Sequence, residues 1–339
     1  MQRLMVGLIV LLVSAGTAWA LWQRSLHPSF VWGVGLNPTP TGVLTAETTH
    51  DVVERARTLG VNTIRVKYTT ENEQQRNRVR WAVTEARTPW WQPLQIVMIL
   101  EHNDLILNGP EPYQAGYDLG LEAASTYRGQ VAYYQLGNEL AAYALKPTWG
   151  GFTPDSYIPE KYERGLTWLR GVSDGIHAGD PKAKRLVTGH WLQHAFWEMA
   201  KDDGLAFEAI GWDWFHEELP VPSLVDFEFE EKPYDLIGKL ASIAETVWVT
   251  EAGVNGDVVG RSKAAAFLTE FITELRTDPR IDGVFVAQLT DEMHNQWSEN
   301  WQHGLIGIEP VDLANQIWRF SDTVRPEYRA YDALIHQTN

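Results

Sequence analysis

Near its middle the chain reads Val131-Ala132-Tyr133-Tyr134-Gln135-Leu136-Gly137-Asn138-Glu139, an apolar run that ends on a carboxylate. Farther along, Thr246-Val247-Trp248-Val249-Thr250-Glu251 has the same form. Short apolar runs of this kind are typical of buried strands. A carboxylate at the end of such a strand adds little to packing, whereas eight-stranded α/β barrels build their active sites at the carboxyl ends of their strands. The two stretches therefore predict that Glu139 and Glu251 converge at the mouth of one barrel.

The rest of the chain supports this prediction, because eight short apolar runs alternate with longer amphipathic segments from Phe30 onward. The predicted strands span residues 31–36, 63–66, 95–100, 131–136, 185–188, 209–214, 246–249 and 283–289. Predicted helices span 45–59, 162–177 and 262–276, each followed by Gly or by a Pro-containing turn. Strands that alternate with helices pair in parallel through right-handed crossovers. We therefore predict one (β/α)8 barrel, a TIM barrel, as a single domain over residues 28–337.

The N-terminus has the features of an export signal. Arg3 precedes an apolar run from Leu4 to Val13, and Ala18-Trp19-Ala20 has the small residues that a signal peptidase accepts. This pattern predicts a signal peptide over residues 1–20. The alternative reading extends the apolar stretch to Trp22, long enough to remain as a membrane tether through residues 4–22. Both readings predict an exported domain, periplasmic or extracellular.

Composition restricts the partners that the protein can have. The formal net charge of −16 argues against a nucleic-acid partner, which favours a basic face that neutralises phosphates. The chain has no cysteine, which excludes disulfides and thiolate metal sites. Stability must therefore come from a large packed core.

The motifs that carry the strand-end carboxylates also carry a family resemblance. Gln135-Leu136-Gly137-Asn138-Glu139 resembles the Asn-Glu signature of clan A retaining glycoside hydrolases, in which the Glu ends strand four as the acid/base. Residues 249–253 are similar to the strand-seven nucleophile segment of that clan, and residues 281–292 and 304–307 resemble its strand-eight region. The resemblance spans roughly Phe30 to Tyr331. Within the clan, the opening Phe30-Val31-Trp32-Gly33-Val34 is similar to family 39 enzymes, some of them associated with bacterial exopolysaccharide production.

This resemblance implies a retaining glycoside hydrolase that acts on a β-linked poly- or oligosaccharide without a cofactor or metal. Glu251 would be the nucleophile and Glu139 the acid/base, so one carboxyl must be ionised and the other protonated. We expect Arg65 to keep Glu251 anionic, and we expect Tyr133 and the charge of Glu251 to raise the pKa of Glu139. Asn138 would donate its amide to a sugar hydroxyl beside the reacting carbon.

Two segments depart from the pattern of the clan. His216 closes the segment that resembles strand six, but Glu218 stands where the clan often has a Tyr that donates to the nucleophile. His216 is therefore a candidate substrate contact. Strand eight lacks the Trp that the clan often has there, so we expect Trp297 or Trp301 to supply the sugar-stacking surface.

Histidines follow several of the predicted strands. His102 and His190, after strands three and five, are expected to contact sugar hydroxyls or to shape the loops. A metal site is the alternative, because His190 and His194 are four residues apart and would share one face of a helix. No H-E-x-x-H motif is present, and we expect no metal.

Each of these residues also has a purely structural interpretation. A strand-end Glu can cap a helix or pair with a surface Arg, Arg65 can form a structural ion pair, and Asn138 can hold a turn. Three other functions remain open from the residues alone. They are a transglycosylase with the same covalent intermediate, a noncatalytic carbohydrate-binding protein on the same fold, and a metal-dependent hydrolase.

Overall fold

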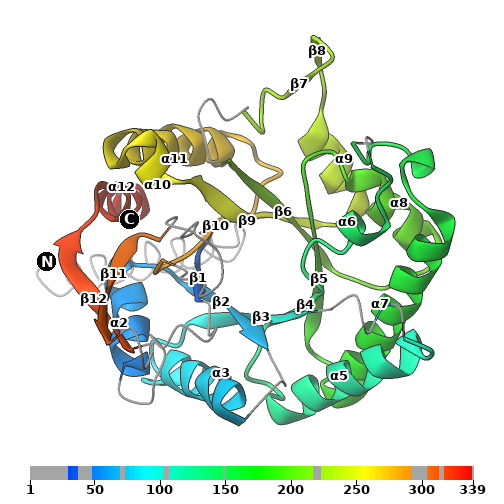
Figure 1. The fold of residues 1–339 in the computed structure, drawn as a ribbon, viewed down its shortest axis with the longest axis horizontal. Helices are drawn as coiled ribbons and strands as arrows, with labels where there is room; N and C mark the ends of the chain where they lie inside the picture. The colour runs from blue at the N-terminus through cyan, green and yellow to red at the C-terminus, as the bar shows by residue number, and fades with distance from the viewer. Residues whose placement is uncertain are drawn as a thin grey trace, which may run out of the picture.

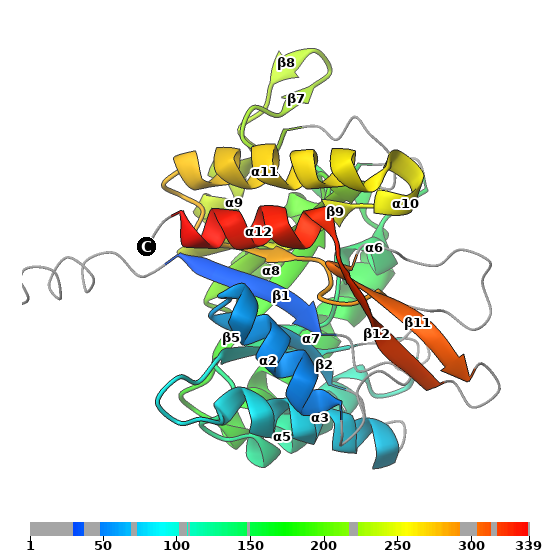
Figure 2. The same cartoon turned by 90° about the vertical axis from the view of Figure 1, so that its left-hand side faces the viewer.

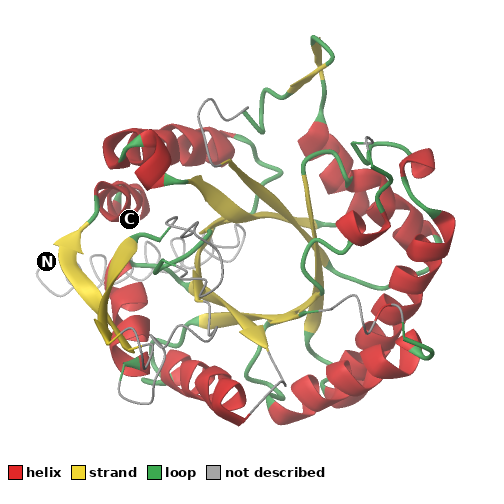
Figure 3. Cartoon of the chain, viewed as in Figure 1, coloured by secondary structure: helices red, strands yellow, loops and turns green. Residues whose placement is uncertain are grey.

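The computed structural model describes residues 30–36, 48–68, 73–101, 107, 109–147, 150–216, 223–291, 304–312 and 317–337. These residues form a closed barrel with the strand order β1-β10-β9-β6-β5-β4-β3-β2, seen end on in Figure 1. Every neighbouring pair of strands is parallel. Helices form the outer ring around the strands (Figure 3). The predicted fold class, a (β/α)8 barrel, is confirmed.

All eight predicted strands are present. They are β1 (Val31–Leu36), β2 (Thr63–Tyr68), β3 (Gln95–Leu100), β4 (Tyr133–Leu136), β5 (Lys184–His190), β6 (Ala209–His216), β9 (Thr246–Val254) and β10 (Gly283–Val286). The limits of β1 and β3 agree with the prediction, whereas β4 begins later and β10 ends earlier. β9 continues through Glu251, so this carboxylate lies within a strand and not at its end.

The helices follow the strands around the barrel. They are α2 (Thr49–Leu59), α3 (Glu73–Arg87), α5 (Pro112–Thr126), α6 (Ala141–Ala144), α7 (Pro159–Gly179), α8 (His194–Asp202), α9 (Leu236–Ile243), α10 (Gly256–Val259), α11 (Arg261–Thr277) and α12 (Pro326–His336), with a 3₁₀ turn at Pro154–Ser156. The predicted helices correspond to α2, α7 and α11. In the described part of the chain no helix is both long enough and apolar enough to span a bilayer.

Two small antiparallel hairpins were not predicted. β7 (Glu228–Phe229) and β8 (Lys232–Pro233) form one, and β11 (Ile306–Asp312) and β12 (Ile317–Val324) form the other. Figure 2 views the barrel from the side, with β1 running from its N-terminal end on the left to its C-terminal end on the right, where β11 and β12 lie. Pro, Gly and Asp interrupt the alternation of apolar and polar residues in 306–312, which conceals the strand in the sequence.

The barrel interior changes from apolar to polar along the strands. Its apolar layer consists of Val97, Tyr133, Leu186, Ala209, Trp248 and Phe285. Because successive strand side chains alternate between the two faces, residues two positions farther along a strand also point inward. Gln135, Thr188 and Thr250 occupy those positions after Tyr133, Leu186 and Trp248, and all three are buried. The polar layer therefore rests on the apolar layer and faces the C-terminal ends of the strands.

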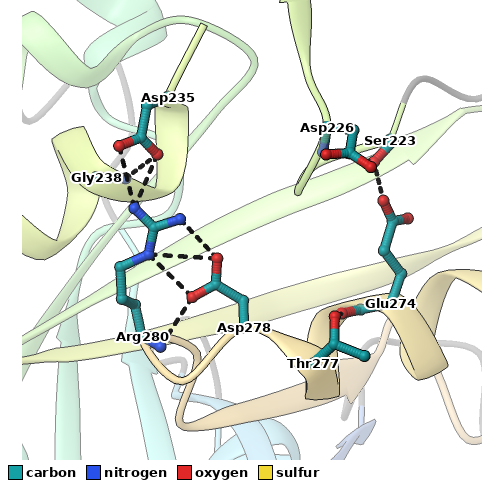
Figure 4. A network of polar contacts seen from close by, with 8 residues as sticks. All are labelled: Ser223, Asp226, Asp235, Gly238, Glu274, Thr277, Asp278 and Arg280. Carbon is teal, nitrogen blue, oxygen red and sulfur yellow. Dashed lines mark hydrogen bonds and ion pairs between the residues drawn. The ribbon is translucent and has the colours of Figure 1, made fainter. Parts of the chain in front are cut away.

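Outside the barrel wall, Arg280 joins the connection before β10 to the start of α9 (Figure 4). Its Nε lies 2.9 Å from Asp278 Oδ1, and its Nη1 lies 2.8 Å from Asp235 Oδ1. Asp235 also caps α9 by accepting from the Gly238 N–H at 2.9 Å. The hydrogen bonds from Arg280 lower the pKa of Asp278 below its ordinary value.

Helices α5 and α7, which follow β3 and β4, pack with their backbones in contact. A Cβ at Gly120 of α5 would lie 2.4 Å from the carbonyl oxygen of Val172. On α7, a Cβ at Gly171 would lie 2.1 Å from the carbonyl oxygen of Tyr113. Glycine weakens an isolated helix, but here it permits an approach that no other residue allows. These contacts hold the two helices that flank the turn after β4.

We expect Gly171→Ala to lower the free energy of unfolding by about 1–3 kcal/mol, because the added methyl group has no room unless the helices separate. Urea unfolding measures the change. His177→Ala, on the exposed side of the same helix, is the matched control and should change stability by less than about 0.5 kcal/mol. A Gly171→Ala protein as stable as the parent would mean that α5 and α7 are not in backbone contact.

Candidate active site

Arg65 on β2 is the centre of a polar cluster at the C-terminal ends of the strands. Its side chain is 3% exposed, and each side of the guanidinium donates to a different acceptor. Nε donates to Gln135 Oε1 at 2.8 Å, and Nη2 donates to Asn138 Oδ1 at 2.7 Å. Nη1 donates to Glu251 Oε1 at 2.5 Å. The structure thus contains the predicted contact between Arg65 and Glu251.

Glu251 compensates the buried charge of Arg65. Burial alone would lower the pKa of this guanidinium, but the charge of Glu251 and its hydrogen bond with Arg65, with smaller contributions from neighbouring carboxyl groups, raise it. Arg65 therefore remains charged and keeps a positive potential next to Glu251. This is the electrostatic environment that an anionic carboxylate needs inside a barrel.

A β-bulge aims Glu251 into the barrel. In β9, Val249 pairs with Trp212 and Glu251 pairs with Asp213, so Thr250 is an extra residue with no partner of its own on β6. In regular alternation Trp248 and Thr250 would face inward and Glu251 outward. The bulge restores Glu251 to the inner face, because an extra residue re-aims the side chains that follow it.

The turn after β4 has an unusual backbone conformation. Gly137 and Glu139 both have positive φ, at 75° and 48°. Glycine adopts this region freely, whereas a glutamate in it is strained by about 1 kcal/mol or more. The Thr188 hydroxyl accepts from the Glu139 N–H at 3.2 Å, and Gln135 Nε2 donates to the Gly137 carbonyl at 2.8 Å. The polar layer therefore holds Glu139 in a conformation that the residue alone would avoid.

Asn138 is oriented by its carbonyl oxygen. Oδ1 accepts from Arg65 Nη2 and from Gln135 Nε2, the latter at 3.0 Å. The oxygen side of the amide is therefore turned toward the polar layer, which leaves the NH2 group as the side that can donate to a ligand.

His190 at the end of β5 contacts Glu139. Its Nδ1 lies 3.0 Å from Glu139 Oε1. On the other side of the ring, Nε2 lies 3.1 Å from the amide nitrogen of Gln193. An amide nitrogen only donates, so Nε2 accepts and the proton of a neutral His190 is on Nδ1, facing Glu139.

Asp213 on β6 is a third carboxyl group in the cluster, and the sequence analysis did not single it out. It pairs in register with His190 on β5 and with Glu251 on β9, and it is 2% exposed. The Thr250 hydroxyl donates to its Oδ1 at 2.6 Å. Burial, together with the charges of Glu251 and Glu139, raises the pKa of Asp213 well above its ordinary value despite Arg65 and Thr250. Asp213 therefore retains a proton under conditions in which an exposed Asp is ionised.

The pKa of Glu139 differs in direction from the prediction. Burial raises it, but the contact with His190, a hydrogen bond from Asp213 and the charge of Arg65 together lower it below the ordinary value. Tyr133, the predicted aromatic neighbour, lies in the apolar layer with its ring 4.6 Å from that of Trp248. The expected raised pKa of Glu139 is therefore wrong for this structure, and the raised pKa belongs to Asp213.

Other predicted site residues are separated from the cluster or lie outside the described residues. His102, Glu218, Trp297 and Trp301 are not among the described residues. The backbone of His216 ends β6 and pairs with Val254, but its side chain is also outside the described part.

The helix face that His190 and His194 would share in the metal alternative does not form. His190 ends β5 and His194 begins α8, so they do not share a helix face. His194 lies 2.6 Å from the Tyr234 hydroxyl and 3.2 Å from Glu198 Oε1, in the buried packing of α8. Across the described ranges, no group of three or more His, Cys, Asp or Glu residues has a metal-binding arrangement.

An exposed indole lies beside the cluster. Trp191 follows His190, has a positive φ of 51° and keeps 39% of its surface exposed. Its ring stacks on Trp214 with centroids 5.5 Å apart, and its carbonyl oxygen accepts from Trp212 Nε1 at 3.0 Å. The ring is therefore fixed in place although much of its surface meets solvent.

No protein-family model matches the chain, and no curated protein matches it in sequence. Its fold is similar to that of the β-glycosidase from Thermosphaera aggregans, with a TM-score of 0.63 and 13% identity over 92% of this chain and 97% of that chain. GH5_18 from Streptomyces cattleya, in complex with GlcNAc, is similar with a TM-score of 0.62 and 14% identity over 91% of this chain and 80% of that chain. A family 39 glycoside hydrolase from Bacteroides cellulosilyticus WH2 is similar with a TM-score of 0.56 and 14% identity over 91% of this chain and 63% of that chain. The chain shares the barrel fold of these glycoside hydrolases.

Replacing Asp213 should change how stability depends on pH. The folded-state pKa of Asp213 is raised, so its contribution to stability is present at low pH and is lost as pH rises through that pKa. Asp213→Asn removes this titration. We expect the variant to gain stability relative to the parent as pH rises above about 4, the ordinary pKa of an Asp side chain, measured by urea unfolding.

Asp278→Asn supplies a control of opposite sign. Because Arg280 lowers the pKa of Asp278, that carboxylate stabilises the fold at neutral pH and stops doing so as the solution is acidified. The variant should therefore lose stability relative to the parent as pH rises. A constant stability difference for Asp213→Asn across the pH range would show that Asp213 titrates normally.

Proposed function

We propose that the protein is a retaining glycoside hydrolase that cleaves β-glycosidic bonds in a poly- or oligosaccharide by double displacement. Glu251 acts as the nucleophile and Glu139 as the acid/base. The observation that carries the proposal is the single hydrogen-bonded cluster in which Arg65 contacts Glu251 while His190 and Asp213 surround Glu139. Two carboxylates that flank one reacting bond are what glycosidic cleavage requires. The fold shared with glycoside hydrolases supports the same assignment.

In the first step Glu251 attacks the anomeric carbon, and the bond to the leaving oxygen breaks. Arg65 keeps Glu251 anionic before the attack and holds it through Oε1. The NH2 group of Asn138, fixed through its own Oδ1, donates to the hydroxyl beside the reacting carbon. Such hydrogen bonds strengthen as the oxocarbenium-like transition state forms.

The leaving oxygen must receive a proton from Glu139, yet in the free protein the pKa of Glu139 is lowered. We propose that Glu139 and Asp213 share one proton, which resides mainly on Asp213 before the reaction. The negative charge of Glu251 is one cause of the raised pKa of Asp213. That charge disappears as Glu251 bonds to the sugar, so ionisation of Asp213 becomes easier and the shared proton moves through Glu139 to the leaving group.

In the second step the ionised Glu139 accepts a proton from water, which attacks the sugar and releases Glu251. His190 Nδ1, 3.0 Å from Glu139 Oε1, stabilises the carboxylate in this role. The restored charge of Glu251 again raises the pKa of Asp213 and returns the cluster to its starting state.

The substrate proposal rests on the chemistry of the cluster and of its rim. Fixed donors and carboxyl groups suit the hydroxyls of a sugar, and the exposed ring of Trp191 offers a stacking surface beside His190. Similar barrels bind carbohydrate, as in the complex with GlcNAc. A polymeric substrate agrees with the predicted export to the periplasm or the cell exterior, which we retain as part of the proposal.

Covalent trapping with 2-fluoro glycosides of several sugars tests the proposal, because the fluorine slows hydrolysis of the glycosyl-enzyme. We expect a mass increase that peptide mapping locates on Glu251. Glu251→Gln should abolish the adduct and reduce turnover at least about 100-fold, and Glu139→Gln should reduce turnover to a similar extent.

The matched control is Glu245→Gln, an exposed glutamate just before the other end of β9, which should retain full activity. Azide should rescue Glu251→Gly with an inverted product and Glu139→Ala with a retained product. If rescue of Glu251→Gly retained the stereochemistry and rescue of Glu139→Ala inverted it, Glu139 would be the nucleophile and Glu251 the acid/base. A folded protein that binds sugars but yields neither adduct nor product would instead be a carbohydrate-binding protein.

The shared proton predicts two opposite shifts in the alkaline limb of the kcat/KM pH profile. Asp213→Asn removes the neighbouring carboxyl, so the remaining proton on Glu139 is lost at lower pH and the limb moves to lower pH. Thr250→Val removes the hydrogen bond that lowers the pKa of Asp213, so the limb should move to higher pH. If both variants have the same pH profile as the parent, Asp213 does not share the catalytic proton with Glu139.

A further inference from the structure

Trp90 and Trp91, in the connection between α3 and β3, are the most exposed large apolar side chains among the described residues, at 82% and 70%. Their rings meet edge to face with centroids 5.9 Å apart. We call residues 88–94 the tryptophan loop. Arg57 donates to the carbonyl oxygens of Ala86 and Thr88, and the Leu94 N–H donates to the Ala86 carbonyl at 2.8 Å. The loop is thus anchored to the barrel while it presents both indoles to solvent.

The tryptophan loop lies at the end of the barrel opposite the candidate active site. It precedes β3, and the parallel strands all begin at that end, the left side of Figure 2. Asn62 joins the start of β3 to the residue before β1, because its side chain donates to the Phe30 carbonyl at 3.0 Å and its main-chain carbonyl accepts from the Gln95 N–H at 2.9 Å. Phe30 therefore lies near the point where the tryptophan loop ends.

The length of the N-terminal part of the chain limits how far the barrel can be from the apolar segment. Residues 23–29 separate Trp22 from Phe30, and seven residues span at most about 25 Å. Trp19 and Trp22 lie at the C-terminal end of the apolar segment, where membrane spans place aromatic residues at the headgroup level. A bilayer that holds this segment would therefore lie within reach of the tryptophan loop.

Charge on one side of this end of the barrel is unlike that of the whole protein. The segments that lead into β3, β4 and β5 carry four exposed cations, which are Arg87 at the end of α3, Arg128, Lys182, and Lys184 at the start of β5. Their acidic residue, Asp180, is buried and accepts from the Gly129 N–H at 2.7 Å. The exposed acids at this end, Asp202, Asp203 and Glu245, precede β6 and β9 instead. The protein as a whole carries a net charge of −16. Cations beside exposed indoles are the combination that favours an anionic lipid surface, at about 1 kcal/mol for each Lys or Arg near it.

We propose that this end of the barrel rests on an anionic lipid bilayer, with Trp90 and Trp91 at the level of the headgroups. The N-terminal apolar segment then acts as a retained tether, and the tryptophan loop and the four cations set the orientation of the barrel on the membrane. The candidate active site faces away from the lipid. The inference does not depend on the proposed function, because it uses only the opposite end of the barrel.

Site-directed spin labelling tests the orientation, since the chain has no cysteine to remove. The full chain is reconstituted in vesicles of equimolar phosphatidylcholine and phosphatidylglycerol, with one label at Gln92→Cys in the tryptophan loop. The matched label is Val258→Cys on α10, which is 56% exposed and follows β9 at the opposite end. We expect oxygen to relax the first label more than a polar nickel complex does, and the nickel complex to relax the second label more.

Two further variants separate the parts of the proposal. Trp90→Ser combined with Trp91→Ser should return the label at position 92 to water, although the tether still binds the vesicle. Arg128→Ser combined with Lys182→Ser should reduce the membrane depth of the label at position 92 in the mixed vesicles but not in vesicles of phosphatidylcholine alone. Equal nickel accessibility at positions 92 and 258 would overturn the proposal. Protection at position 92 accompanied by dipolar broadening between labels would also overturn it, because a second copy of the chain would then cover the loop.

Discussion

The buried charge of Arg65 is the constraint on which the candidate site depends. A guanidinium that is 3% exposed is stable only if good acceptors replace the water that it has lost. Gln135, Asn138 and Glu251 supply them from β4, from the turn after β4 and from β9. Because the fork of the guanidinium is planar and rigid, it fixes these three side chains relative to one another. Positions far apart in the sequence thus become parts of one geometric unit.

This unit is as rigid as the barrel because its members stand on strands. Gln135 and Thr188 lie one inward position beyond Tyr133 and Leu186 of the apolar layer, so dense packing below supports the polar groups above. Thr188 in turn holds the backbone of Glu139 in its strained conformation. Electrostatic catalysis needs groups that are already oriented before the charge develops, and strand positions orient them better than mobile loops.

The sequence predicted the strands well, because each is a short apolar run between turn residues. It also identified Glu139, Glu251 and the contact with Arg65, since strand-end polar residues of one barrel must converge. It missed Asp213, which lies between Trp212 and Trp214 within an apolar strand, although an acid between two buried tryptophans is itself unusual. The pKa of Glu139 was predicted in the wrong direction because it depends on neighbours from other strands.

The extra residue at Thr250 makes the orientation of Glu251 a question of strand register. A strand side chain has only two directions, so pairing of the same residues without the bulge would turn Glu251 toward the helices that cover the strand, with no intermediate arrangement. Substitutions elsewhere in the barrel shift side chains by small amounts that packing can absorb. Divergence within residues 246–254 can therefore alter composition freely at several positions, whereas a shift in pairing that removed the bulge would invert the side chains after Thr250 in one step.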